Sequence, residues 1–279
     1  VTGAQAFVVI DRLEDMKDYM NEEAEKGDDK KEKVAEFNDL ALEDVHFSFP
    51  DDSENDKKGF NLSGIDLKIR RGEKVAVVGK IASGKTTLLN LVSGIYEPEK
   101  GEVLLNGKRL DSICMPEFRE KIGFIQQEPI IFSESVYTNI DFWREHEEDW
   151  VHYSSGIAQF RSEVEKFPGG FNEKIGQRGV KLSGGQRQRL SISRAVCGSP
   201  ELLLMDDVTS ALDAENEMQF WEDLFRDFPD ITCLIVTHRI STAQKADRII
   251  VLDEGRIEAE GDHAELMRIS PTYKELAVR

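Results

Sequence analysis

Two adjacent carboxylates, Asp206 and Asp207, follow the apolar run LLLM in the second half of the chain. Carboxylate oxygens are the ligands that a hard cation such as Mg²⁺ prefers, and the end of a buried strand can hold one in place. If Asp206 holds a metal ion, the role of Asp207 depends on how far its side chain reaches.

The segment GKIASGKT matches the phosphate-loop pattern G-x-x-x-x-G-K-[ST]. In this pattern the glycines let backbone N–H groups curl around phosphate oxygens, the lysine reaches the β- and γ-phosphates, and the hydroxyl ligates Mg²⁺. A valine-rich strand pattern precedes the segment and a helical pattern follows it, as nucleotide binding at a helix N-terminus requires. The alternative is a glycine-rich turn with a surface lysine. The residues predicted to bind ATP here are Gly79, Lys80, Ile81, Ala82, Ser83, Gly84, Lys85, Thr86 and Thr87.

A second motif, LSGGQRQRLSISRAV, begins at Leu182 and continues into a basic, amphipathic helix pattern. About twenty residues later comes the strand that ends in aspartate. This arrangement resembles the signature of the ATP-binding cassette (ABC) ATPases. The resemblance runs from about Leu40 to Arg279 and includes five motifs in the family's order. A plain helix cap is the alternative for the serine and the glycines alone, and the ordered series argues against it.

The resemblance implies roles for residues around the phosphate loop. Gln127 in IQQEP matches a glutamine that contacts Mg²⁺ and the attacking water and links the site to a helical subdomain; Gln126 is the less favoured choice. Asp206 matches the aspartate that holds Mg²⁺, normally through water, together with Thr86. His238 in VTHR matches a catalytic histidine that contacts the γ-phosphate, although a lone histidine after a strand is more often structural.

Other motifs concern adenine and the partner subunit. Phe49 in HFSFP matches an aromatic residue that stacks on adenine; the alternative is a core strand residue, with Phe47 on the opposite face. In the family the signature of one subunit closes over the phosphate loop of another, so each ATP lies head to tail between two cassettes. SALD, which ends at Asp213, matches the loop that contacts the partner subunit. The signature residues expected at the partner's nucleotide are Ser183, Gly184, Gly185 and Gln186.

Three positions depart from the family's pattern. Ala82 replaces a glycine, which is a mild change, and Gln177 replaces the second acidic residue of a loop similar to T-E-V-G-E-R-G that couples cassette to membrane domain in exporters. Asp207 replaces the catalytic glutamate that orients the water and is one methylene shorter. A misplacement of roughly 1 Å at a reacting centre can lower a rate on the order of 10²-fold. We therefore expect ATP binding to persist while turnover at this site is weak.

Strands that alternate with helices must position these residues, which predicts an α/β fold with a mainly parallel sheet. LALEDVHFSFP and NLSGIDLKI have the period-two pattern of an antiparallel strand pair, and RIIVLDEGRIEAEG predicts a final hairpin. The resemblance adds a P-loop NTPase (RecA-like) core, an antiparallel β-subdomain and an α-helical subdomain at about 130–192. The ABC ATPase domain is predicted at 39–279. Residues 1–38 are predicted to be an amphipathic helix and a charged linker that follow a missing transmembrane domain.

Composition limits the function classes. The formal charge of -18 argues against binding to nucleic acid. No run approaches the roughly 18 apolar residues that span a bilayer. Three widely spaced cysteines indicate buried thiols in a reducing compartment. The chain begins with Val1, which favours a fragment of a longer polypeptide; the alternative is removal of an initiator methionine.

The leading interpretation is the ATP-hydrolysing domain of an exporter-type ABC transporter at the cytoplasmic face of a membrane. Its expected partners are a transmembrane domain on the same polypeptide and a second, non-identical ABC domain with a catalytic glutamate. An intact signature beside Asp207 is similar to the degenerate half of asymmetric exporters. The alternatives are a regulatory module that never cleaves its ATP and an ABC ATPase that is not linked to transport. The sequence does not indicate the transported substrate.

Overall fold

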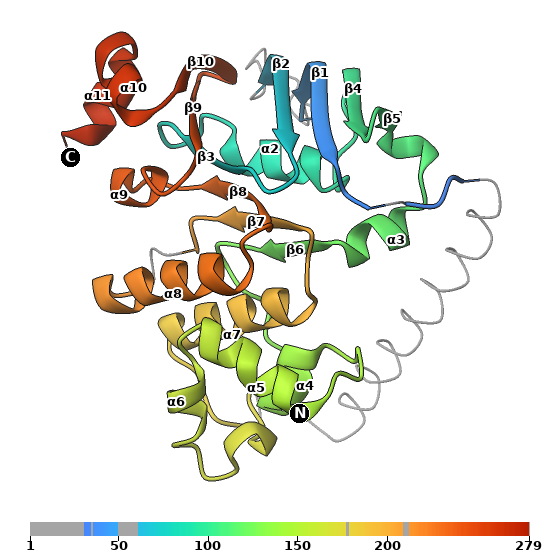
Figure 1. Ribbon diagram of the computed structural model, residues 1–279, viewed down its shortest axis with the longest axis vertical. Helices are drawn as coiled ribbons and strands as arrows, with labels where there is room; N and C mark the ends of the chain where they lie inside the picture. Colours follow the sequence, from blue (N-terminus) through green and yellow to red (C-terminus); the bar gives the residue numbers. More distant parts are fainter. Residues whose placement is uncertain (1–30, 35, 50–60, 177–178, 209–211, 279) are drawn as a thin grey trace, which may run out of the picture.

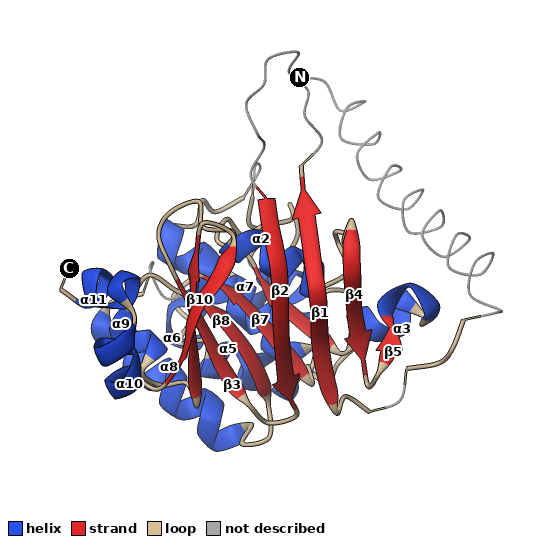
Figure 2. Cartoon of the chain, turned by 90° about the horizontal axis from the view of Figure 1, so that it is seen from above, coloured by secondary structure: helices blue, strands red, loops and turns tan. Residues whose placement is uncertain are grey.

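The computed structural model describes residues 31–34, 36–49, 61–176, 179–208 and 212–278. Two sheets run through the molecule, and a group of helices packs below the larger one in the view of Figure 1. Figure 2 shows the strands of the smaller sheet side by side. This arrangement confirms the predicted α/β class with an antiparallel β-subdomain and a helical subdomain.

The larger sheet has six strands in the order β10-β9-β3-β8-β7-β6. They are β3 (Lys74–Val78), β6 (Ile122–Ile125), β7 (Leu202–Asp206), β8 (Thr232–Val236), β9 (Arg248–Asp253) and β10 (Arg256–Gly261). All neighbours pair in parallel except β10 and β9, which form the predicted hairpin. Strands β7 and β8 are buried at every position, which explains their continuous apolar sequences. The carboxyl ends of β3, β6, β7 and β8 therefore meet at one edge of the sheet.

The smaller sheet has four strands in the order β2-β1-β4-β5, all antiparallel. They are β1 (Asp39–Ser48), β2 (Asn61–Arg70), β4 (Lys100–Leu105) and β5 (Lys108–Arg109). The pairing of β1 with β2 confirms the strand pair predicted from their alternating sequences. One core cluster joins side chains of this sheet, of the helix after the phosphate loop and of the larger sheet.

The described helices cover the two faces of the larger sheet unequally. Leu88, Leu89 and Val92 of α2 belong to the core shared by both sheets. A second core, on the other face, contains side chains of α4 to α8 and of β6 to β8. The helices are α2 (Lys85–Val92), α3 (Met115–Glu120), α4 (Val136–Asp141), α5 (Glu148–Ile157), α6 (Arg161–Val164), α7 (Gly184–Cys197), α8 (Ala214–Asp227), α9 (Ile240–Ala243), α10 (His263–Ile269) and α11 (Pro271–Ala277), with short 3₁₀ helices at Leu110–Ser112 and Gly170–Asn172.

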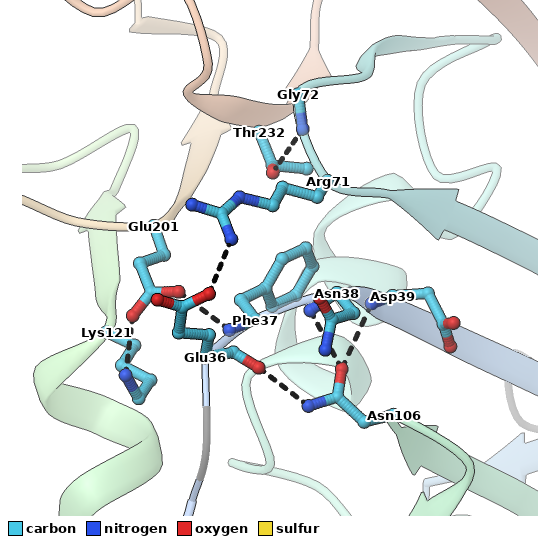
Figure 3. A network of polar contacts seen from close by, with 10 residues as sticks. All are labelled: Glu36, Phe37, Asn38, Asp39, Arg71, Gly72, Asn106, Lys121, Glu201 and Thr232. Atoms are coloured by element: carbon cyan, nitrogen blue, oxygen red, sulfur yellow. Dashed lines mark hydrogen bonds and ion pairs between the residues drawn. The ribbon is translucent and has the colours of Figure 1, made fainter.

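The segment just before β1 hydrogen-bonds to residues next to strands of both sheets (Figure 3). The backbone N–H of Phe37 donates to Glu201 Oε2 at 2.7 Å, and Glu201 also pairs with Lys121 at 2.5 Å. Asn106 Oδ1 accepts from the backbone N–H groups of Asn38 and Asp39. Phe37 is fully buried. The last residues of the predicted linker therefore contact the folded body just before β1 begins.

The amphipathic helix predicted near the N-terminus lies outside the described residues. Within the described part of the chain, no helix combines the length and apolarity needed to cross a membrane. Cys197 and Cys233 are buried free thiols, as predicted, whereas Cys114 is half-buried.

Candidate functional site

The phosphate loop connects the carboxyl end of β3 with the first residue of α2, Lys85. Its shape depends on two glycines. A Cβ on Gly79 would lie 2.1 Å from the carbonyl oxygen of Leu252 in β9, and Gly84 has φ 105, in the left-handed region. Ala82 also has a left-handed backbone, with φ 62. A non-glycine residue there costs roughly 1–2 kcal/mol, which explains why the family's glycine is favoured at this position.

The side chain of Lys85 folds back over its own loop. Its ammonium group donates to the carbonyl oxygens of Gly79 (3.0 Å) and Lys80 (2.7 Å) and to Ser83 Oγ (3.3 Å). Burial lowers the pKa of Lys85, while the charges of Asp206 and Asp207 oppose that shift. A buried cation surrounded by exchangeable acceptors is well placed to bind phosphate oxygens.

Thr86 and Asp206 form the centre of a candidate Mg²⁺ site. Thr86 Oγ1 donates to Asp206 Oδ2 at 2.7 Å, across 120 residues of sequence. Only 6% of Asp206 is exposed, and burial raises the pKa of its carboxyl, with Asp207 adding to the shift and Thr86 and Lys85 opposing it. A hydroxyl and a buried carboxylate are hard oxygen ligands, so the residues present fit Mg²⁺. Thr86 and Asp206 are two of the three residues for which the sequence predicts metal binding; the third is Gln127.

Asp207 follows β7 with an unusual backbone. Its φ is 48, in the left-handed region, and its N–H donates to the carbonyl oxygen of Val236 in β8 at 2.9 Å. Aspartate tolerates this conformation better than most residues, because its short polar side chain can bond locally. The half-buried side chain lies close enough to Lys85 and His238 to affect the pKa of both.

Gln127 and His238 follow strands that end at the same edge of the sheet. β6 pairs with β7 so that Ile125 lies opposite Met205, and β8 ends at Val236, opposite Asp206. Both Gln127 and His238 are exposed. Although His238 is exposed at the surface, partial desolvation of its ring and the charge of Lys85 lower its pKa, and Asp207 and Asp206 oppose that shift. The neutral form of the imidazole is therefore favoured at pH 7.

Phe49 belongs to a three-ring cluster on the surface. It meets Phe47 and Tyr96 edge-on, with ring centroids 5.0 and 5.6 Å away, and Phe47 stacks on Tyr96 at 5.0 Å. Phe47 was predicted on the opposite face, and that prediction was wrong, because residues two apart in a strand share a face. Phe49 is 41% exposed while Phe47 is buried. The exposed ring of Phe49 can accept an adenine, and the other two rings hold it.

The signature motif begins α7 with a capping box. Ser183 Oγ accepts from the N–H of Gln186 at 3.2 Å, and Gln186 Oε1 accepts from the N–H of Ser183 at 2.9 Å. Ser183 and Gly184 are exposed, and a Cβ on Gly184 would approach only Arg187, at 4.0 Å. The helix start is therefore open to a second molecule, while the Gln186 side chain, predicted to bind nucleotide, hydrogen-bonds to the N–H of Ser183 and to Glu163 of α6.

The loop predicted to contact the partner subunit is described only at its end. Ser210 and Ala211 lie outside the described residues, as does Gln177. Asp213 is exposed and caps α8, where its side chain accepts from Asn216 N at 2.9 Å and from Asn216 Nδ2 at 2.6 Å.

The sequence did not single out two residues that support the site. Tyr96 completes the aromatic cluster, and its only signal is an aromatic residue after the phosphate-loop helix. Glu217 is buried in α8 and accepts from Arg239 and Thr242 at 2.5 Å each, next to His238. Nothing in the local sequence indicates that Glu217 contacts residues more than twenty positions away.

The comparisons with known proteins agree with this geometry. Residues 62–210 match the family model described as ABC transporter. An ATP-dependent lipid A-core flippase from Cupriavidus pinatubonensis is 41% identical over 219 residues, which are 77% of this chain and 37% of that protein. ABC transporter B family member 21 from Arabidopsis thaliana is 38% identical over 82% of this chain and 18% of its own length.

Two further similarities extend over nearly the whole chain. Multidrug resistance protein 1 from Entamoeba histolytica is 34% identical over 98% of this chain and 20% of its own length. The solved structure of a bacterial Atm1-family ABC exporter with ATP bound superposes with a TM-score of 0.82 and 27% identity, over 90% of this chain and 43% of that one. The chain thus spans less than half the length of each of these proteins. Because the family model covers more than half of its residues, the chain belongs to the ABC transporter family.

Proposed function

We propose that this chain is the nucleotide-binding domain of an ABC exporter. It binds MgATP at the phosphate loop and, by closing head to tail on a second ABC domain, powers the movement of a substrate across a membrane. One observation carries the proposal: the Thr86–Asp206 hydrogen bond brings a magnesium-type oxygen pair beside the buried ammonium of Lys85. The relatives that are named as flippases and multidrug resistance proteins support the transport function.

Each site residue then has a defined task. The ammonium of Lys85 exchanges its three loop acceptors for β- and γ-phosphate oxygens. Thr86, Asp206 and Gln127 would hold Mg²⁺, which would neutralise charge on the phosphates. His238, as a neutral imidazole, contacts the γ-phosphate, and Phe49 stacks on adenine. The protein supplies position and charge, and water is the nucleophile.

We infer that the site built on this chain's own phosphate loop turns over slowly. Asp207 stands in place of a glutamate, and its carboxylate reaches one methylene less far toward a water molecule. The signature, in contrast, has a complete capping box and an exposed start. The signature of this chain therefore completes the ATP site of a partner domain, and that partner supplies the catalytic glutamate.

The proposed transmembrane partner would contact an aromatic patch, which we define as Ile130, Phe132, Phe142 and Trp143. Phe132 contacts the rings of Phe142 and Trp143 at centroid distances of 5.5 and 5.8 Å. Ile130 is 61% exposed and Trp143 is 50% exposed. Large apolar side chains gathered on a surface are typical of interaction sites. On this proposal residues 1–38 lead from the transmembrane domain, and the patch faces it at the cytoplasmic side of the membrane.

The test is nucleotide binding with and without magnesium. A ligand that binds only the folded state stabilises it by about 2.7 kcal/mol at 100 times its dissociation constant. We expect saturating MgATP to raise the unfolding temperature of the chain, and the Lys85→Ala substitution to remove that increase. Thr86→Ala should remove the additional effect of Mg²⁺ over ATP in EDTA. An unfolding temperature of the wild-type chain that is insensitive to MgATP would contradict the proposal.

A second candidate, a regulatory module that binds ATP without cleaving it, is favoured by Asp207. Single-turnover measurement with labelled ATP at each site of the assembled pair separates the two. Phosphate release from this chain's site on the timescale of transport indicates an enzyme. Retention of intact ATP through many partner turnovers indicates a regulatory module.

A further inference from the structure

We propose that Glu163 of α6 is a positioning residue that sets the signature serine for the partner's nucleotide. This inference rests on the proposed function, because Ser183 acts only where two ABC domains meet. Glu163 lies 20 residues before Ser183 in the sequence, outside the signature motif.

A series of hydrogen bonds connects α6 to the start of α7. Glu163 Oε2 accepts from Gln186 Nε2 at 2.9 Å. Gln186 Oε1 accepts from the N–H of Ser183 at 2.9 Å, and Ser183 Oγ accepts from the N–H of Gln186 at 3.2 Å. One carboxylate therefore connects, through a single amide side chain, to the backbone and hydroxyl of the serine.

The hydrogen-bonding chemistry of Glu163, Gln186 and Ser183 determines which way the Gln186 amide points. An ionised carboxylate only accepts hydrogen bonds, so Glu163 attracts the NH₂ end of the Gln186 amide. The oxygen end must then face Ser183, whose N–H requires an acceptor. The reverse orientation would set an oxygen against the carboxylate and an NH₂ group against the N–H. Glu163 thereby selects the one amide orientation that closes the capping box.

Arg189, one turn after Gln186 in α7, forms an ion pair with Glu163. It donates to Glu163 Oε1, and its side chain is 9% exposed. Its Nε is buried and has no hydrogen-bond partner among the described residues. Glu163 is therefore a counter-ion for a buried guanidinium as well as a guide for Gln186, and its charge should be essential to both contacts.

The consequence is an effect in trans. The phosphate loop, Thr86 and Asp206 lie on other elements, so a change at Glu163 leaves this chain's own ATP binding intact. It disturbs the serine that completes the partner's site. Loss of Glu163 should lower turnover at the partner's ATP while hardly changing the KM.

The experiment compares three single variants in the intact transporter that contains this chain. Glu163→Gln removes the charge and allows both amide orientations. Glu165→Gln is the matched control, because Glu165 lies two residues further on, is exposed and pairs only with Arg161 among the described residues. Ser183→Ala removes the signature hydroxyl. We expect about a fivefold lower kcat for Glu163→Gln, the factor set by a weakened capping interaction, with no change for Glu165→Gln.

A double substitution tests the route. If Glu163 acts mainly through Gln186, Glu163→Gln should lower kcat much less in the Gln186→Ala background, where only the contact with Arg189 remains to be lost, than in the wild type. Additive losses would overturn the positioning role. Hydrogen exchange at the Ser183 amide should become faster in Glu163→Gln while the middle of α7 stays protected. Should Glu163→Gln fail to fold, Gln186→Glu opposes two carboxylates and tests the same contact from the other side.

The outcomes separate the two proposals. If Ser183→Ala leaves ATP hydrolysis unchanged, the proposed head-to-tail function fails. If Ser183→Ala lowers hydrolysis but Glu163→Gln behaves like Glu165→Gln, the positioning role of Glu163 fails and the proposed function survives.

Discussion

At the scale of single residues, Asp207 differs from a glutamate in backbone tolerance as well as in reach. Its φ of 48 lies in the region that favours glycine, asparagine and aspartate. A glutamate at this position would bring its carboxylate closer to the attacking water, but it would adopt the left-handed backbone less readily than aspartate does. Stability and turnover at this site should therefore respond to substitution in opposite directions.

The Asp207→Glu substitution tests that opposition. Restoring the methylene should raise single-turnover hydrolysis at this chain's own site by up to about 10²-fold. It should also lower the free energy of unfolding by less than about 1 kcal/mol, because glutamate adopts the left-handed region less readily. Labelled-ATP turnover and urea denaturation measure the two effects. Asp207→Asn keeps the length without the charge and should stay as slow as the wild type; faster turnover in that variant would contradict the assigned role.

The raised pKa of Asp206 predicts a pH-dependent effect on stability. Because the folded state binds this proton more tightly than the unfolded state, the contribution of Asp206 is fully present below its unfolded pKa and is lost as pH rises through the folded pKa. In EDTA without nucleotide, Asp206→Asn should therefore be more stable than the wild type at about pH 8, and the difference should shrink toward about pH 4. Urea denaturation across this range gives the difference directly. A difference in stability that widens as the pH falls would contradict a raised pKa for Asp206.

The phosphate loop, Asp206 and the signature could be predicted at this scale because each motif is a contiguous pattern with its own chemistry. The aromatic cluster around Phe49 and the engaged amide of Gln186 could not. Tyr96 and Glu163 reach these residues only through the fold, across 47 and 23 positions, and no local pattern encodes such contacts.

At the scale of elements, α8 connects the loop before it to the loop after β8. Asp213 caps the first turn of the helix, and Glu217, one turn later, holds Arg239 and Thr242 beside His238. If the loop before α8 contacts a partner subunit, as proposed, a shift of Asp213 would be passed through the first turn of α8 to the loop that carries His238.

The Glu217→Ala substitution should break this connection. Removing a buried hydrogen-bonded carboxylate leaves donors to find new partners, which costs about 1–3 kcal/mol. We expect a lower unfolding temperature and slower ATP hydrolysis with nearly unchanged ATP affinity. Glu222→Ala, at an exposed position of the same helix, is the control and should change neither quantity. Equal effects of the two substitutions would rule out a special role for Glu217.

The strands were predictable because their patterns have few competing interpretations. Apolar and polar residues alternate in β1 and β2 because only one face of these strands is buried. The apolar runs of β7 and β8 are continuous because both faces of these strands are buried. The residues just before β1 were predicted as the end of a charged linker that reaches residue 38. Phe37 is nevertheless buried, since Glu201 and Asn106, distant in sequence, supply acceptors for the backbone there.

At the scale of the whole molecule, the aromatic patch and the nucleotide site belong to different parts of the fold. The patch lies around α4, whereas the phosphate loop lies between β3 and α2. Arg194 of α7 stacks on Phe132 and Phe142, so the signature helix contacts the patch directly. A membrane partner bound at the patch would thus contact the signature helix.

Substitution of the patch should uncouple the two activities. In the intact transporter, Trp143→Ala with Ile130→Ala should reduce substrate-stimulated ATP hydrolysis several-fold, since buried aromatic anchors carry much of an interface's energy. MgATP binding to the chain should not change. Met218→Ala, at an exposed position of α8, is the matched control for loss of surface apolar area. Full stimulation in the double variant would exclude this surface as the contact with the transmembrane domain.

The final hairpin contacts the phosphate loop, which lies far earlier in the chain. The N–H of Gly255 donates to the carbonyl oxygen of Ser83, the carbonyl of Gly255 accepts from Ser63, and Gly79 packs against Leu252. During synthesis, at about 5–20 residues per second, the phosphate loop leaves the ribosome well before these partners exist. The nascent chain therefore lacks the contacts that shape its ATP site until β9 and the turn after it have emerged. A ribosome stalled before residue 252 should carry a chain that contains every phosphate-loop residue and still fails to retain ATP.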